Sequence, residues 1–194
     1  MLGRFGTAIG FDLSSVGLQY SRQAGSRLIV TASVAEVPFA DQTFDVVAAF
    51  DVLYALDEDT ESRAVKEIHR VLRPGGSAII NVAALPILRG THAAFGGEQR
   101  RSTRRRLRAL LESSGFTVTR LTYTNASIFP LVLAVRITQR LSGLASHEET
   151  SSDIAVPPRI INGALRWLLS LEARAMKFID MPIGSSLLCV ANKS

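Results

Sequence analysis

The sequence predicts an α/β protein whose mostly parallel sheet is flanked by helices and ends in an antiparallel strand. In the first half of the chain, short and nearly continuous apolar runs alternate with helical patterns, which is typical of βαβ units. The second half contains an amphipathic helix, an alternating strand and a last apolar strand. At about 150 residues per domain, 194 residues indicate a single domain spanning residues 1–194.

Four apolar runs of the first half are expected to be strands buried on both faces of the sheet, because their apolar character is nearly continuous. These runs are residues 7–11, 27–32, 44–50 and 77–82. In the second half, alternation favours a half-exposed strand over residues 116–123, and a last strand is expected over residues 185–191.

Helices are expected over residues 14–24, 60–72, 103–114 and about 160–178. Ser14 or Ser15 can cap the first helix and Gly25 can end it. The second has one apolar stripe and ends at Pro74 with two glycines after it. Residues 139–153 are polar and rich in serine, so a flexible loop is predicted over residues 139–158.

Composition excludes several classes of protein. The chain is 47% hydrophobic, which is ordinary for a globular protein, and its longest apolar run, residues 128–135, is too short for a membrane span. The single cysteine, Cys189, permits no internal disulfide and no zinc cluster, which fits the reducing cytoplasm. Three scattered histidines show no metal-ligand spacing, so no metal site is expected.

The net charge of +5 is local. Residues 100–108 contain six arginines, and without them acidic groups would outnumber basic ones by one. General nucleic-acid binding is therefore not expected. On the helix over residues 103–114, Arg104, Arg105 and Arg108 can face solvent, or they can contact an acidic acceptor. The apolar residues 128–135 form core or join these arginines at a membrane surface as a peripheral contact.

Asp12 ends the first apolar run. A carboxylate at such a strand end can accept hydrogen bonds from both hydroxyls of a ribose. It can equally cap the helix that begins just after it. Both interpretations remain open from the residues alone.

The segment from Ala8 to Val82 resembles the class I S-adenosylmethionine-dependent methyltransferases. The resemblance rests on AEVPFADQTFDVVAAFDVLYALDED followed by EIHRVLRPGGSAIINV, in the family's order and spacing. It implies a Rossmann-like fold, S-adenosylmethionine as cofactor, and methyl transfer to a small-molecule, glycan or lipid acceptor.

The resemblance also implies site residues. Asp12, followed by Leu13, matches the ribose-binding acid, and Ser33 with Val34 matches the adenine-binding position, where the family usually has an aspartate. Phe50 and Asp51 match the residues lining the methionine part of the cofactor, and Tyr54 lies near the acceptor side. His92, in the loop after the fourth apolar run, is the candidate general base.

One family feature is missing. A glycine-rich loop precedes the ribose-binding acid by about 20 residues in such folds, but Asp12 has only eleven residues before it. Gly3, Gly6 and Gly10 do not make the spaced pattern. The chain is therefore expected to lack the first strand and most of the first helix. Open strand edges, low stability and weak or absent cofactor binding are the expected consequences.

Two alternatives to methyl transfer follow from the residues. A nicotinamide-dependent short-chain reductase needs a lysine four residues after a tyrosine, and no tyrosine of this chain has one. The other alternative is an inactive remnant of the methyltransferase fold that acts as a protein- or RNA-binding module. Retained cofactor binding would count against that remnant.

Overall fold

The computed structural model describes residues 6–86, 99–141 and 158–194. Every strand and helix expected from the sequence is present in some form, whereas the helix over Phe129–Leu141 and a short 3-10 helix were not predicted. The helices are α1 (Ser15–Gln23), α2 (Glu58–Val71), α3 (Arg104–Ser113), α4 (Phe129–Leu141) and α5 (Arg159–Ala175), with a short 3-10 helix at Leu53–Ala55. The strands are β1 (Gly10–Asp12), β2 (Ile29–Thr31), β3 (Phe44–Phe50), β4 (Leu72–Ala83), β5 (Phe116–Thr124) and β6 (Ser186–Lys193).

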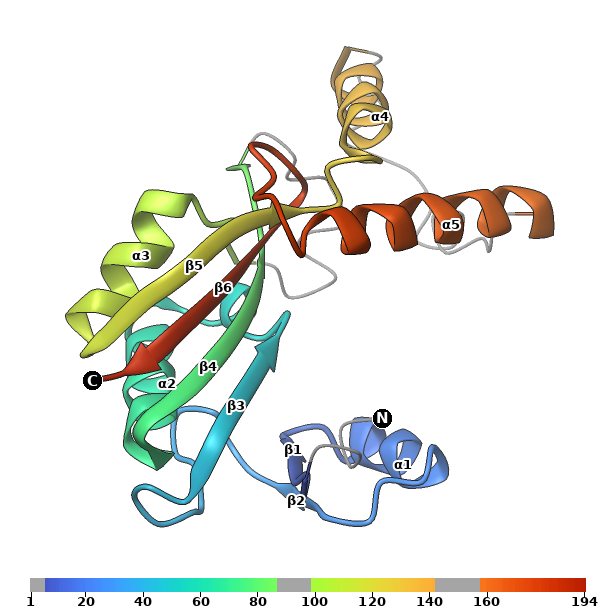
Figure 1. The fold of residues 1–194 in the computed structure, drawn as a ribbon. Helices are drawn as coiled ribbons and strands as arrows, with labels where there is room; N and C mark the ends of the chain where they lie inside the picture. Colours follow the sequence, from blue (N-terminus) through green and yellow to red (C-terminus); the bar gives the residue numbers. More distant parts are fainter. Residues whose placement is uncertain (1–5, 87–98, 142–157) are drawn as a thin grey trace.

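The main sheet has four strands in the order β3-β4-β6-β5. β3 and β4 pair in parallel, and β6 pairs antiparallel with both β4 and β5, so three strands run one way and the last strand runs the other. The predicted mixed sheet with an antiparallel C-terminal strand is therefore confirmed. Figure 1 shows α2 and α3 together on one side of this sheet.

The prediction that all four apolar runs of the first half are buried was wrong. β1 and β2 form a separate two-stranded parallel sheet, onto which α1 packs. In the described part of the chain β3 pairs only with β4, so its outer edge is open. Val46 and Phe50, on one face of β3, are each 54% exposed, whereas Ala49 on the other face is buried in the core. A continuous apolar run shows what a strand can bury, but burial of all its side chains requires that both faces of the sheet be covered.

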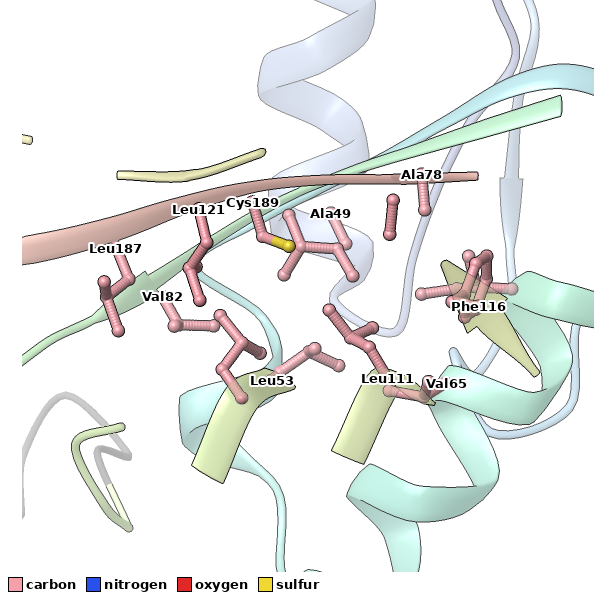
Figure 2. Packing of buried hydrophobic residues seen from close by; sticks show 14 of the residues in the cluster. Ala49, Leu53, Val65, Ala78, Val82, Leu111, Phe116, Leu121, Leu187 and Cys189 are labelled. Carbon is pink, nitrogen blue, oxygen red and sulfur yellow. The ribbon is translucent and has the colours of Figure 1, made fainter. Parts of the chain in front are cut away.

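The core lies between the main sheet and the two helices α2 and α3. Figure 2 shows Leu53, Val65 and Leu111 facing Val82, Leu187 and Cys189 on the sheet. Leu53, Val65, Leu111, Leu187 and Cys189 have no exposed surface. Burial raises the pKa of the Cys189 thiol to about 11, so Cys189 is an apolar core residue, as its sequence environment indicated.

Two predicted boundaries were wrong. α2 ends at Val71, and the fully buried Leu72 already belongs to β4, which also contains the turn-like Pro-Gly-Gly segment. The loop predicted over residues 139–158 does not begin at 139, because α4 continues to Leu141. Helical hydrogen bonds propagate through the apolar first half of α4 into these polar residues. Residues 142–157 lie outside the described part of the chain.

The buried Glu172 of α5 fixes the segment that leads into α4. Its carboxylate accepts hydrogen bonds from the backbone N–H groups of Ala126 and Ser127, at 3.0 and 2.8 Å, and from the Ser127 hydroxyl at 2.5 Å. Burial alone would raise the pKa of Glu172, but these hydrogen bonds outweigh it and hold the pKa below its ordinary value. The ionised carboxylate of Glu172 therefore stabilises the contact between α5 and the segment that leads into α4.

Glu172→Gln is expected to lower the free energy of unfolding by about 1–3 kcal/mol at neutral pH, because an amide replaces a buried carboxylate that accepts three hydrogen bonds. The pKa of Glu172 is depressed, so its contribution is complete above about pH 4.5, the value in the unfolded chain, and is lost as pH falls through the folded value. Thermal unfolding of both proteins from pH 7 to pH 3 should show the difference shrinking. Glu112→Gln, at an exposed carboxylate, is the control. A stability difference between wild type and E172Q that does not change with pH would show that the ionised carboxylate of Glu172 is not the stabilising group.

Candidate functional site

Asp12 lies at the carboxyl end of β1, where the sequence predicted a ribose-binding acid. Its Oδ1 accepts a hydrogen bond from the backbone N–H of Ser14 at 2.8 Å. Ser14 in turn caps α1 by accepting from Gly17 N at 3.1 Å. A Cβ on Gly17 would stand 3.5 Å from Asp12 Oδ2. One oxygen of the Asp12 carboxylate thus fixes the backbone at the start of α1. The next residue, Leu13, is 69% exposed.

The segment after β2 carries Ser33 and Val34 and is held in place by α2. The Ser33 hydroxyl accepts from Ala35 N at 3.2 Å. Glu67 on α2 accepts from Val37 N at 2.8 Å, and Arg70 donates to Val37 O at 2.9 Å. The hydrogen bond from Arg70 holds the pKa of Glu67 below its ordinary value, so this acid stays ionised near neutral pH. Helix α2, which packs on the main sheet, therefore holds the predicted adenine-binding segment in place.

Asp51 follows β3 and has a left-handed backbone, with φ of 56°. Such a conformation is uncommon for a residue other than glycine and gathers at functional sites. Asn81 on the neighbouring β4 stabilises it from two sides: Asp51 N donates to Asn81 O at 3.0 Å, and Asn81 Nδ2 donates to Asp51 Oδ1 at 3.0 Å. The preceding Phe50 is 54% exposed.

Asn81 was not predicted as a site residue. The signal for it was present, because a single polar amide interrupts the apolar run of residues 77–82 close to the end of its strand. Parallel neighbours end at the same edge of a sheet, and the register of β3 on β4 brings Asn81 beside Asp51 there.

Tyr54 lies in the 3-10 helix after β3 and is half-buried. Its backbone oxygen accepts from Gln99 N at 3.0 Å and from Arg100 N at 3.3 Å. The chain therefore returns to Tyr54 just after the segment that contains the predicted base. His92 itself lies outside the described residues.

Arginines 100–108 largely form contacts within the chain. Arg104 is half-buried: it lies 4.8 Å from the centre of the Tyr123 ring and donates to Met181 O at 3.0 Å, so the prediction that it faces solvent was wrong. Its place near the start of α3 turns it toward β5, which sequence spacing could not show. Arg106 donates to both carboxylate oxygens of the buried Glu61, through its terminal nitrogens Nη1 and Nη2. Arg108 pairs with Glu112 at 3.4 Å.

The structure thus joins some of the predicted residues and leaves others apart. Asp51 is bonded to Asn81 in the main sheet. Asp12 and Ser33 lie at or just after the ends of β1 and β2, which pair with each other and with no other described strand. No group of three or more His, Cys, Asp or Glu side chains among the described residues is arranged to hold a metal ion. The donors available are carboxylate, amide, hydroxyl and backbone groups, which suit an organic ligand.

Comparison with known proteins gives the context of these residues. A sequence family described as "Methyltransferase domain" matches residues 1–80, which include Asp12, Ser33, Val34 and Asp51. The ubiquinone/menaquinone biosynthesis C-methyltransferase of Haemophilus ducreyi is 33% identical over 95 residues, covering 45% of this chain and 36% of its own length. The Mus musculus protein named "Probable tRNA methyltransferase 9B" is 32% identical over 78 residues, covering 40% and 17%.

Solved structures extend the likeness over the full chain. A SAM-dependent methyltransferase of Thermotoga maritima superposes with a TM-score of 0.64 and 15% identity, covering 100% of this chain and 76% of the other. The aligned segments amount to less than half the length of the curated relatives. Residues 1–80 match the methyltransferase domain family, and the chain shares the fold of solved S-adenosylmethionine-dependent methyltransferases.

Proposed function

We propose that this protein binds S-adenosylmethionine and takes part in methyl transfer to a small-molecule, glycan or lipid acceptor. The observation that carries the proposal is the coincidence of the family match over residues 1–80 with three strand ends that bear polar groups: Asp12 after β1, Ser33 and Val34 after β2, and Asp51 after β3. In open α/β sheets, ligands bind outside the carboxyl ends of the strands.

The residues present fit parts of that cofactor. The Asp12 carboxylate uses one oxygen for Ser14 N and has further lone pairs with which to accept from the ribose hydroxyls. The Ser33 hydroxyl accepts from Ala35 N, and the backbone N–H of Val34 is the donor assigned to the adenine ring. Asp51, fixed by Asn81, and the exposed Phe50 would border the methionine part.

The cofactor supplies an already activated methyl group on a sulfonium, which a nucleophilic oxygen, nitrogen or carbon displaces. The protein's part is therefore alignment more than activation. Tyr54, in the 3-10 helix that follows Asp51 and β3, is assigned to the acceptor side. His92 is assigned as the base for an acceptor that must lose a proton.

The state of the arginines supports a small or lipid acceptor over a nucleic acid. Arg104 and Arg106 already contact Met181 O and Glu61, and Arg108 pairs with Glu112. Binding of a phosphate backbone would require these contacts to be exchanged. We propose the cytoplasm as the location of the protein.

Asp12→Asn tests the cofactor site. The amide keeps an oxygen for Ser14 N but loses the charge that strengthens bonds to the ribose, so the affinity for S-adenosylmethionine should fall about ten- to a hundredfold. Isothermal titration calorimetry measures the change. Asp59→Asn, an exposed carboxylate in the first turn of α2, is the matched control and should leave the affinity unchanged. Equal binding by wild type and D12N would exclude Asp12 from the site. No binding by the wild-type chain would favour the remnant alternative.

A further inference from the structure

Helix α5 presents a row of large apolar side chains to solvent. Ile160 is 86% exposed, Trp167 67% and Leu171 46%, and Phe178, just beyond the helix end, is 87% exposed. Spacings of seven and four residues place the three helical members on one face. These four residues are called the apolar stripe below. No helix in the described part of the chain is long and apolar enough to cross a membrane.

A different face of α5 is attached to the fold, and the attachment keeps the apolar stripe exposed. Glu172 lies about 100° around the helix from Leu171 and binds Ala126 N and Ser127 N. At the end of α5, Arg120 of β5 pairs with Asp180 at 2.7 Å. Figure 1 shows α5 extending away from the main sheet beyond the end of β5. The anchored helix is thus a fixed arm with one free apolar face.

Cations border the apolar stripe. Arg159, Arg166, Arg174 and Lys177 are all exposed, and no ion pair links them to an acid of the described residues. At 100° per residue, Arg159, Arg166 and Arg174 project onto one flank of the stripe, within about 120° of Ile160, and Lys177 follows just beyond the helix end. The single acid of α5, Glu172, is buried. This set of four cations is called the basic border.

We propose that α5 docks this protein on the surface of an anionic phospholipid membrane, with the apolar stripe in the headgroup–acyl boundary and the basic border on lipid phosphates. An amphipathic helix with Trp and Phe on one face and Arg and Lys beside them suits such an interface. A nucleic acid would match the cations but would leave Ile160 and Leu171 without an apolar partner. The proposal goes beyond methyl transfer and does not depend on it.

Trp167 is the only tryptophan of the chain, so its fluorescence reports on α5 alone. Vesicles of phosphatidylcholine with about one third phosphatidylglycerol should shift its emission to shorter wavelength and make the protein sediment with them. Vesicles of phosphatidylcholine alone should bind at least about tenfold more weakly, and raising salt from about 0.1 to 0.5 M should weaken binding to the anionic vesicles.

Ile160→Glu places an acid on the most exposed helical residue of the apolar stripe and should lower vesicle partitioning at least about tenfold. Val16→Glu is the matched control, because Val16 is an apolar helical residue, 56% exposed, on α1. It should leave partitioning unchanged. Equal loss of vesicle partitioning in both variants, or no shift of the Trp167 emission with anionic vesicles, would overturn the proposal.

Two other results would assign the apolar stripe to a different partner and so overturn the proposal. Trp167 emission that shifts with protein concentration in the absence of lipid would assign the stripe to a second copy of the chain. An emission shift with RNA but not with vesicles would assign it to nucleic acid.

Discussion

Glu61→Ala is expected to lower the free energy of unfolding by about 2–3 kcal/mol, because Arg106 loses the buried carboxylate that it binds most closely and keeps only the exposed Glu58 at 3.7 Å as a carboxylate partner among the described residues. Glu61 lies on α2 and is 2% exposed, whereas Arg106 lies on α3 and donates to Glu61 Oε1 at 3.1 Å and also to Oε2. The pair therefore joins the two helices that cover the main sheet. Chemical denaturation followed by circular dichroism measures the loss.

The neighbouring exposed pair supplies the control. Arg108 and Glu112 are separated by 3.4 Å on the surface of α3, and Glu112→Ala should cost no more than about 0.5 kcal/mol. A double variant, Glu61→Met with Arg106→Met, should recover most of the stability lost by E61A, because apolar groups of similar size need no charge partner. If the double variant is as unstable as E61A, the loss comes from packing rather than from the lost ion pair.

Local signals in the sequence predicted the elements that they define. Thr103 caps α3 by accepting from Arg106 N at 3.2 Å, and Gly115 beyond its end has φ of 91°, as expected of a helix stop. α4 was missed because its apolar residues carry neither a capping signal nor a clear amphipathic period. The exposure of β3 could not be predicted either, since burial depends on neighbours elsewhere in the fold and not on a strand's own residues.

The candidate site was partly predictable for the same reason. Asp12 ends an apolar run, so its position along the chain makes it a candidate, whereas Ser33 and Asp51 are candidates through the resemblance to the methyltransferases. The anchoring of the Ser33 segment by Glu67 and Arg70 spans about 30 residues of sequence and depends on how α2 packs. The left-handed backbone of Asp51 depends on Asn81, which only the register of β3 on β4 brings beside it.

Gly184→Ala is expected to destabilise the protein by about 1–3 kcal/mol or more, because the site has no room for a side chain. A Cβ there would lie 2.2 Å from the backbone oxygen of Thr124 and 3.1 Å from Tyr123 Cβ. Gly184 is buried where the chain turns into β6, beside the end of β5. The clash falls on backbone atoms of a paired strand, so relief requires displacement of β5 or β6 rather than rotation of a side chain. Thermal unfolding measures the loss.

Gly163→Ala is the matched control for Gly184→Ala. It lies within the exposed helix α5, and a Cβ there would meet nothing within 4 Å. Gly163→Ala should therefore stabilise the protein by about 0.5–1 kcal/mol through helix propensity, the opposite sign to the same change at Gly184. Loss of stability in both variants would mean that α5 packs against more of the chain than its exposed residues indicate. Stabilisation by G163A with a loss by G184A would show that the turn before β6 packs tightly against β5, whereas α5 at Gly163 has room for a side chain.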